Sequence, residues 1–528
     1  MATPIELEVF NKLFASVAEE MGIVLRRSAF SANIKERRDF SCALFDRQGL
    51  LLAQAAHIPV HLGAMPLAMA AVHSGRKWSP GDVVILNDPY KGGTHLPDIT
   101  LIAPVYCGEP HPLFFVAARA HHADVGGIEP GSMPVATDIR QEGVIIPPTR
   151  LVRAGSAHHS FLEDFLRRCR SATERQGDLD AQLAALRRGS LRLEELVARH
   201  GRERLEEMGA ELMAYSQRAM RRCISRIPDG IYEWQDLLDD DGCETEDIPI
   251  HLRLTIRDDQ VEADFTQSSP QVKGGVNAVR AVTQSALVYV FLCLMDQSYP
   301  INHGCFEPLA LHTRPGTICD AKFPAPVAAG NVETSQRLVD VLLGALALAL
   351  PGEIPAASCG SMNNVAIGNS PDSEGPEFTY YETIGGGMGA RRDMDGLDGV
   401  HTHMTNTLNT PVEAIEHSYP LLIETYRLIP GSGGRGRYRG GRGIRRDYRF
   451  LAPARVSLLS ERRRHPPTGT RGGEPGRAGE NILFRKKKPQ RLPGKVNLEV
   501  LVGDLLSIRT PGGGGFGRKK KLPIKRKI

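Results

Sequence analysis

The sequence lacks the features that mark membrane-spanning and disulfide-stabilised proteins. It has no run of eighteen apolar residues, and its most apolar stretch, 339–350, is too short to cross a bilayer. The nine cysteines form no CxxC pair, and none follows Cys359, a pattern typical of reduced thiols. No basic stretch leads into an apolar core near the N-terminus, so we expect no signal peptide. These absences predict a soluble cytoplasmic protein with no membrane partner.

Nucleotide-binding motifs are missing as well. The segment nearest to a phosphate-binding P-loop, 512–519, has Arg where the motif needs Lys, and it lacks the Ser or Thr. GSGGRG at 431–436 matches GxGxxG literally, but no strand–helix–strand pattern surrounds it and the region is rich in glycine. We therefore expect this chain to bind neither ATP nor a dinucleotide through a known loop motif.

Positive charge is concentrated at the C-terminus. The net charge is +4, and the last eleven residues, 518–528, contain seven Lys or Arg and no acid. Without this segment the net charge would be −3. A nucleic-acid-binding protein carries its basic residues on a folded surface. The segment therefore predicts a solvated, disordered basic tail and no nucleic-acid partner.

Hydrophobic periodicity predicts a mixture of helices and strands. Helical periods occupy 5–28 and 160–227, and glycines at 177, 189 and 201 are expected to separate successive helices in the second segment. Short apolar runs punctuated by Pro and Gly predict strands between these helices and again after 230. The predicted strands are 40–45, 82–86, 99–106, 113–118, 231–238, 248–256 and 261–265, and further helices are predicted at 278–296 and 335–350.

The predicted fold class is α+β, a mixed multi-domain enzyme subunit with antiparallel strand pairs and helical segments. At 528 residues the chain can form two or three hydrophobic cores. The pattern divides it into an N-terminal region, a helical segment, a central α+β region, a glycine-rich β region and the tail. The corresponding ranges are 1–155, 156–228, 229–380, 381–517 and 518–528.

Two neighbouring segments contain the residues that suggest a metal-binding or catalytic site. NDPYKGGTHLPDITLIAPV (87–105) and RAHHAD (119–124) together hold His95, Asp98, His121, His122 and Asp124. His95 and Asp98 lie in a loop broken by Gly and Pro, and the two apolar runs that follow predict an antiparallel pair returning His121 to Asp98. Imidazole and carboxylate groups suit Zn, Mn or Fe. A hydrogen-bonded polar network and a metal-free acid–base pair are the alternatives.

Other polar residues are weaker candidates. His57 and His61 in HIPVHLG favour structural or supporting roles. His401 and His403 alternate as on a strand and, with Asn406, could line a substrate pocket. Glu142 could be a pocket acid or, more simply, could anchor a loop. Cys42 is expected to be a buried small residue.

The sequence resembles the hydantoinase B/oxoprolinase family from its first helix to about residue 517. The corresponding stretches here, in family order, include RRDFSCALFD (37–46), NDPYKGGTHLPD (87–98), RAHHADVGG (119–127), DGVHTHMTNTLNTPVE (398–413) and TPGGGGFG (510–517). The resemblance implies one divalent metal (Zn, Mn or Fe) held by two aspartates and two histidines. On this chain these are Asp39, His95, Asp98 and His121, which would also form the catalytic group.

Asp39 enters the predicted site through the resemblance alone, since it is remote in sequence and has no histidine beside it. The choice between His121 and His122 stays open from the sequence, because adjacent strand residues point to opposite faces. We favour His121 as the ligand, with His122 and Asp124 orienting the ligands.

The resemblance also implies an activity and a partner. It predicts the catalytic B subunit of an ATP-dependent cyclic amidohydrolase that opens 5-oxoproline or an N-methylhydantoin. A hydantoinase A-type subunit would bind ATP and Mg and form a hetero-oligomer with this chain. A subunit of an ATP-dependent ketone or lactam carboxylase and a non-catalytic assembly protein are the alternatives. The carboxylase relatives are longer, which favours ring-opening hydrolysis.

Overall fold

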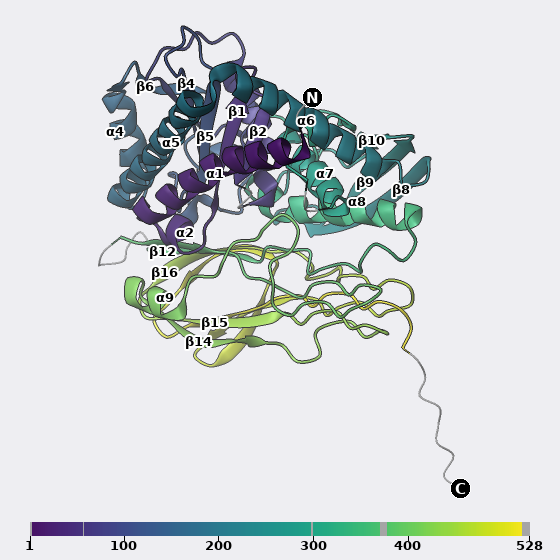
Figure 1. Ribbon diagram of the computed structural model, residues 1–528. Helices are drawn as coiled ribbons and strands as arrows, with labels where there is room; N and C mark the ends of the chain where they lie inside the picture. The colour runs from purple at the N-terminus through teal and green to yellow at the C-terminus, as the bar shows by residue number, and fades with distance from the viewer. Residues whose placement is uncertain (1–2, 56–57, 297–298, 370–376, 520–528) are drawn as a thin grey trace.

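The computed structural model describes residues 3–55, 58–296, 299–369 and 377–519 in two layers. The purple-to-teal part of the chain forms an α+β layer, and the green-to-yellow part forms a β-rich layer beneath it (Figure 1). His57 and most of the predicted basic tail lie outside the described residues. The mixed α+β class predicted from the sequence is confirmed. Within the described ranges, no helix combines the length and apolar character that crossing a bilayer requires.

A seven-stranded antiparallel sheet forms the centre of the upper layer. Its strand order is β2-β1-β5-β4-β3-β6-β7, and every residue of its central strands β4 and β5 is buried. Strands buried on both faces read as continuous apolar runs rather than alternating ones, as 99–106 does in the sequence. The bounds are β1 Phe40–Asp46, β2 Leu51–Ala55, β3 Val83–Leu86, β4 Asp98–Val105, β5 Phe114–His121, β6 Thr149–Arg153 and β7 Ser156–Ala157.

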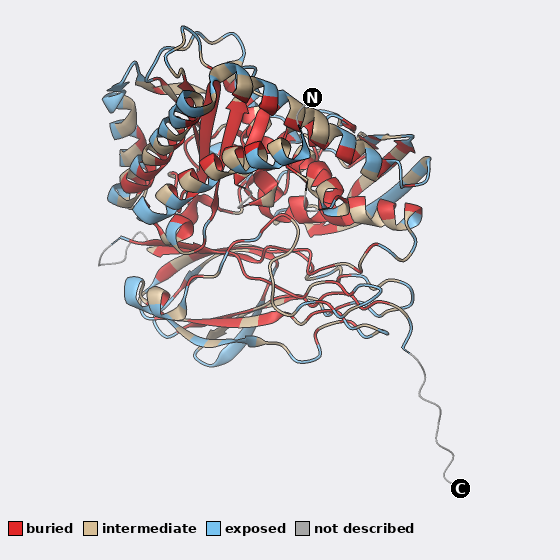
Figure 2. Cartoon of the chain, in the orientation of Figure 1, coloured by how far each residue is buried: buried red, intermediate tan, exposed pale blue. Residues whose placement is uncertain are grey.

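Helices cover both faces of this sheet. Helices α1 (Pro4–Ser28) and α5 (Ala172–His200) pack against each other, α1 on β1 and β2 and α5 on β4 and β5. Met65 and Met69 of α3 (Ala64–His73) pack with Phe45 and Phe115 on the other face. Figure 2 shows the resulting band of buried residues in the sheet. The remaining helices of this region are α2 Ala32–Lys35, α4 His159–Arg168 and α6 Arg202–Ile224.

The predicted helix breaks at Gly177 and Gly189 are wrong, because both residues lie inside α5. A Cβ on Gly177 would lie 2.4 Å from the Phe30 ring, and one on Gly189 would lie 2.5 Å from the Met21 sulfur. These glycines therefore allow close packing of α5 on its neighbours. Only Gly201, with a φ of 80°, separates two helices, α5 and α6.

A second sheet and two apolar helices complete the upper layer. The order is β11-β10-β9-β8, antiparallel except for the parallel β10–β11 pair. The acidic segment 239–242 begins in the last two residues of β8 and continues into the β8–β9 hairpin connection. A π-helical turn, η6 (Gly330–Thr334), leads directly into α8. The bounds are β8 Gly230–Asp240, β9 Glu246–Arg257, β10 Gln260–Asp264, β11 Leu309–His312, α7 Arg280–Leu294 and α8 Ser335–Ala349.

The lower layer consists of two antiparallel sheets around a separate hydrophobic core. Their orders are β13-β12-β16-β19 and β14-β15-β20-β17-β18, and side chains such as Ile367, Tyr448 and Leu506 fill the core between them. The predicted domain boundary after residue 380 falls within β13. The bounds are β12 Asn364–Asn369, β13 Thr379–Glu382, β14 Leu421–Leu428, β15 Ile444–Phe450, β16 Ala454–Leu459, β17 Glu480–Arg485, β18 Lys488–Leu492, β19 Lys495–Val500, β20 Leu505–Arg509 and α9 Val412–Ser418.

The glycine-rich segments of this layer pack backbone against backbone. The amide of Gly513 donates to the carbonyl of Gly441 at 2.9 Å, and the amide of Gly441 donates to the carbonyl of Met388 at 2.8 Å. A Cβ on Gly513 would lie 2.1 Å from the Met388 carbonyl oxygen. The density of glycine is therefore a packing requirement at this position, where backbone atoms occupy the space of a side chain.

We expect Gly513→Ala to destabilise the chain by about 1–3 kcal/mol, because a backbone segment must move to admit the methyl group. The measurement is the free energy of unfolding in denaturant. Gly275→Ala is the matched control, since its Cβ would meet its nearest atoms at 3.6 Å, an ordinary contact. Equal stability of the two variants would contradict the packing argument.

Candidate active site

Three of the predicted residues meet where the interior strands β1, β4 and β5 of the seven-stranded sheet begin or end. Asp98 begins β4 and His121 ends β5, and the antiparallel register places them directly opposite each other. Asp39 immediately precedes β1, and its carbonyl accepts a hydrogen bond from the His121 amide at 3.0 Å. The sheet therefore brings together residues that are 82 positions apart in sequence. The predicted return of His121 to Asp98 is confirmed.

His95 reaches the same point from the loop between β3 and β4. The Asn87 side chain fixes this loop, because its amide donates to the carbonyls of Leu96 and Val144 and its oxygen accepts from the Ile146 amide. His95 Nε2 lies 3.3 Å from Asp98 Oδ2.

The four side chains that the resemblance implies form a buried group. The His95 ring centroid is 5.0 Å from that of His121. Asp39 is 6% exposed, and His95, Asp98 and His121 are 3% exposed or less.

His61 is a further member of this group. Its Nε2 lies 3.3 Å from Asp98 Oδ2, and its Nδ1 lies 2.9 Å from the Ser41 hydroxyl oxygen. The Thr94 hydroxyl donates to the same Asp98 oxygen. The sequence favours a supporting role for His61 but gives no sign of which residue it supports, because its place depends on 3₁₀-helix η1 (Pro59–His61) folding beneath β1.

Arg37 and Tyr381 lie against the acidic and imidazole groups. Arg37 Nη2 is 3.5 Å from Asp39 Oδ2, and its guanidinium lies 4.9 Å from the centre of the Tyr381 ring. The His121 ring stacks on Tyr381 at 4.5 Å with 7° between the planes. Tyr381 belongs to β13, so the lower layer contributes directly to the group. Neither residue was predicted from the sequence. Arg37 is two positions from Asp39, which itself enters only through the resemblance, and Tyr381 is brought to the group by the fold of the lower layer.

Burial and neighbouring charge set the protonation of the group. Burial disfavours the Asp98 carboxylate, but His95 and His61 outweigh it and hold its pKa well below the usual value. For Asp39, burial raises the pKa to about 6 against the opposing effect of Arg37, and Asp98 adds to the rise. Burial, with His95 beside it, holds the pKa of His121 well below its usual value. Asp98 is therefore ionised and His121 neutral at neutral pH.

Asn33 determines the tautomer of His121. Its Oδ1 accepts from Arg37 Nη1 at 3.3 Å, so its amide Nδ2, 3.2 Å from His121 Nδ1, is the group that faces the imidazole. Nδ1 is then the acceptor, and the proton of the neutral ring sits on Nε2. A cation binding at Nε2 would replace this proton, as metal binding to imidazole commonly does.

The donor chemistry of the group suits a divalent ion, but a ligand geometry is not formed. Nδ1 of His95 and Nε2 of His121 are buried without a hydrogen-bond partner among the described residues, and such atoms are costly unless something binds them. Two carboxylates lie beside them. Even so, no set of three or more His, Cys, Asp or Glu side chains in the described ranges is spaced to hold a metal.

His122 and Asp124 point elsewhere. His122 Nε2 lies 2.9 Å from Gln182 Oε1, and Gln182 in turn donates to the carbonyls of Ile99 and Ala118. His122 therefore faces α5, the opposite side from His121. Asp124 accepts from the amides of Gly126 and Gly131 and pairs with Arg170 at 3.0 Å. It fixes a loop.

The three residues predicted to bind substrate do not share one surface. His401 and the exposed Asn406 line an open hollow of about 580 Å³, whereas His403 Nε2 lies 3.7 Å from Asp340 Oδ1. The predicted strand-like alternation is wrong, since 401–411 contains no strand and His403 has a φ of 59°. Burial and Arg37 lower the pKa of His401 to about 4, against the opposing effects of Glu382 and of a hydrogen bond with Asn409.

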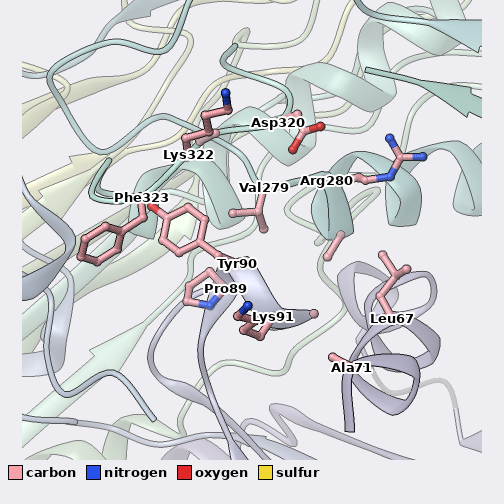
Figure 3. A pocket seen from close by; sticks show the side chains of 13 residues that line it. Leu67, Ala71, Pro89, Tyr90, Lys91, Val279, Arg280, Asp320, Lys322 and Phe323 are labelled. Atoms are coloured by element: carbon pink, nitrogen blue, oxygen red, sulfur yellow. The ribbon is translucent and has the colours of Figure 1, made fainter. Parts of the chain in front are cut away.

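A second cavity lies on the outer side of the loop that carries His95. The cavity has a volume of about 460 Å³, and Figure 3 shows the Phe323 ring beside Tyr90 among the residues that line it, with Lys91, Arg280 and Lys322 also in the lining. Gly92 lines the cavity, and its carbonyl accepts from Arg119, whose pKa burial lowers to about 10 against the opposing effect of Asp98. The loop thus faces the buried group on one side and, on the other, a cavity with a largely apolar lining that also includes Lys91, Arg280 and Lys322.

The two remaining candidates, Cys42 and Glu142, have structural roles. Cys42 is buried, and burial raises the pKa of its thiol far above the usual value, so it is no nucleophile. Glu142 Oε1 accepts from the amides of Val327 and Ala328 at 2.8 and 2.9 Å. Glu142 therefore anchors the loop before η6.

Comparisons with a family model and with known proteins both point to the oxoprolinases. The family model for hydantoinase B/oxoprolinase matches residues 3–519. The chain is 40% identical to 5-oxoprolinase 1 of Arabidopsis thaliana over 98% of its own length and 42% of that protein. It spans about two fifths of the length of the 5-oxoprolinases that it matches.

Two solved structures share the fold over 98% of this chain. The ATP-dependent caprolactamase from Pseudomonas jessenii has a TM-score of 0.91 and 27% identity, with 92% of that chain covered. A nucleotide-free structure of acetone carboxylase has a TM-score of 0.89 and 19% identity, with 76% covered. The second likeness concerns the fold alone.

The buried Glu142 predicts a pH dependence of stability. Burial raises its pKa to about 8, and the amides of Ala328 and Val327 oppose this rise. Between about pH 4.5 and 8 the folded state keeps this proton and the unfolded state loses it, so stability falls as pH rises. We expect Glu142→Gln to remove this dependence, which corresponds to about one proton. Urea unfolding from pH 5 to 8 would measure it, and the exposed Glu262→Gln should retain the wild-type slope.

Proposed function

The chain belongs to the hydantoinase B/oxoprolinase family, and we propose that it is the ring-opening subunit of an ATP-dependent cyclic amidohydrolase. The substrate class is a cyclic amide such as 5-oxoproline or an N-methylhydantoin. The observation that carries the proposal is the buried convergence of Asp39, His95, Asp98 and His121 from three separated stretches. The likeness to a caprolactamase and to 5-oxoprolinases supports the choice of a ring amide.

Asp39, His95, Asp98 and His121 are the residues that would hold one divalent ion. Such an ion, Zn, Mn or Fe, supplies polarisation of a carbonyl oxygen and a more acidic bound water. Burial of these four side chains excludes bulk water from the site and strengthens the charge interactions within it. His61 and Thr94 fix the ionised Asp98 oxygen, and Arg37 holds Asp39.

Hydrolysis of the ring requires water to add to the carbonyl carbon, the C–N bond to break and the leaving nitrogen to take up a proton. A ring amide is a poor electrophile because of its resonance, so coupling to ATP provides the activation. Arg37 supplies fixed positive charge beside Asp39. His401, neutral and lining the hollow, is suited to a hydrogen bond with a polar group of the substrate. Asn406 would contact substrate from the rim of the same hollow.

A hydantoinase A-type partner subunit that uses ATP and Mg belongs to the proposal. The chain corresponds to about two fifths of each 5-oxoprolinase that it matches, which leaves room in those proteins for a nucleotide-using part. The caprolactamase chain, by contrast, is covered over 92% of its length. A chain of this size can therefore exist as a separate subunit, and it would form a hetero-oligomer with its partner.

We expect Asp98→Asn to lower ATP-dependent ring opening at least about 100-fold in the complex reconstituted with the partner, because the fixed negative charge of the group is lost. The assay follows release of glutamate from 5-oxoproline together with phosphate. Asp82→Asn is the matched control, since Asp82 is equally buried (1% exposed) and adjoins the same sheet at the other end of β3. Full activity of Asp98→Asn would sink the proposed role of the group.

The carboxylase alternative predicts a different product. Labelled bicarbonate added to the reconstituted complex with ATP should leave no label in the product if the chain serves ring hydrolysis. Incorporation of label into a ketone or lactam acceptor, without release of an amino acid, would replace the hydrolase proposal by the carboxylase.

Divalent cation content is a separate expectation. The purified full chain should bind about one Mn²⁺ per molecule in equilibrium dialysis, and His121→Ala should weaken this binding by more than tenfold, because one of the four donors is lost. His122→Ala should bind Mn²⁺ as the wild type does, since its ring faces α5. The reverse pattern would assign the ligand role to His122.

A further inference from the structure

Glu333 is a buried carboxyl with no part in the mechanism proposed above. It lies in the π-helical turn η6 and is 0% exposed. Its Oε1 accepts from Asn364 Nδ2 at 2.8 Å and from the Met362 amide at 3.1 Å. Ser361 contributes a further side-chain hydrogen bond to this carboxyl. Single π-helical turns are rare and occur often at functional sites, so the environment of Glu333 requires an explanation.

A short chain of contacts runs from Glu333 to the His/Asp group. Asn364, the first residue of β12, binds Glu333 with its amide nitrogen and accepts from the Tyr381 hydroxyl with its oxygen at 2.7 Å. The Tyr381 ring then stacks on His121. Each link is a specific contact between side chains, and the chain joins η6 in the upper layer to β12 and β13 in the lower layer before it returns to β5.

The charge around Glu333 keeps it neutral. Glu461 is nearby and fully buried, and it pairs with Lys495 at 2.6 Å and with Arg337 at 3.1 Å. Burial and the negative charge of Glu461 raise the pKa of Glu333 to about 8. At neutral pH Glu333 therefore acts as a hydrogen-bond acceptor for Asn364, and it does not act as a counter-ion.

We propose that Glu333 is a positioning residue of the active site, which holds the Tyr381 ring through Asn364 and so fixes the plane and direction of the His121 imidazole. The inference rests on the proposed function for its catalytic meaning, although the coupling itself is a property of the chain. Partners behind a ligating imidazole typically change metal affinity or activity by about 10–100-fold when they are lost.

The first experiment measures the coupling without any metal. In the full chain with ¹³Cε1-labelled histidine, the His121 resonance is assigned by its loss in His121→Gln. Stacking on Tyr381 shifts this resonance by the ring current. We expect Glu333→Leu to move it, because Asn364 and then Tyr381 lose their anchor. Glu333→Gln should leave it in place, since Gln retains the Oε1 acceptor and matches the neutral acid.

Asp82→Leu is the matched control for this experiment. Asp82 is 1% exposed, but it accepts from the amides of Ser79 and Ala154 at the far end of β3 and has no contact with η6 or its flanking loop. We expect Asp82→Leu to lose stability and to keep the His121 resonance. A resonance that moves equally in both Leu variants would indicate general loosening of the fold and would overturn the proposal.

The second experiment tests whether loss of this coupling changes metal binding and catalysis. In the same full chain, Mn²⁺ affinity should fall about 10–100-fold in Glu333→Leu, stay near the wild-type value in Glu333→Gln, and fall to an intermediate value in Tyr381→Phe. In the reconstituted complex kcat should follow the same order while KM for 5-oxoproline changes little. The double variant Glu333→Leu/Tyr381→Phe should be no worse than Glu333→Leu, because both act through one path.

The two proposals fail in different ways. If the wild-type chain binds no Mn²⁺ and opens no ring, the proposed function is wrong, and the His121 resonance still decides whether Glu333 holds the imidazole. If the wild type binds Mn²⁺ and Glu333→Leu binds it equally well, with an unchanged resonance, the positioning role is wrong and the proposed function stands. Should Glu333→Leu fail to fold, Tyr381→Phe and Asn364→Leu test the same path, and wild-type behaviour of both would overturn the proposal.

Discussion

The antiparallel register of β4 and β5 is the constraint on which the site depends. It places Asp98 opposite His121, and the neighbouring β1 then sets Asp39 beside His121 through a backbone hydrogen bond. A shift of one residue would turn His121 toward α5 and bring His122 to the site, because strand side chains alternate between faces. The buried Arg119 side chain favours this register, because its Nε donates at 2.7 Å to the hydroxyl of Thr100, the residue directly opposite it.

The second requirement is the contact between the two layers. The carboxylates and imidazoles of the group come from the upper layer, whereas Tyr381 and the Thr383 hydroxyl, which accepts from Arg37 at 2.9 Å, come from the lower one. Arg37 is fully buried, and a buried guanidinium is stable only when its donors are satisfied. The lower layer therefore stabilises the charge that balances Asp39. This explains why a β-rich layer without acidic site residues is needed for a site built on the other layer.

Sequence patterns predict local structure well and long-range partners poorly. Periodicity predicts α1 closely. The paired apolar runs predict the β4–β5 hairpin, with His95, Asp98 and His121 at the end away from its turn. Asp39 enters only through family resemblance, and Arg37 and Tyr381 are missed, because their roles arise from contacts between layers. Gly177 and Gly189 mislead for the same reason: a glycine that ends a helix and one that admits a neighbouring ring look alike in sequence. The alternation of His401 and His403 suggests a strand, but the positive φ of His403 breaks it.

The charge balance of the buried group is an argument for an ion. Asp98 is ionised, His121 is neutral, and Arg37 is the cation beside Asp39. Burial raises the pKa of Asp39 to about 6 against the opposing effect of Arg37, and the Asp98 charge adds to the rise. Two carboxylates buried side by side are costly unless their charge is compensated. A divalent ion would supply positive charge at this point, and that sign suits the negative oxygen that develops when water adds to an amide carbonyl. The Asp39 and Asp98 carboxylates, which disfavour each other's ionisation in the free chain, would then be stabilised by the ion.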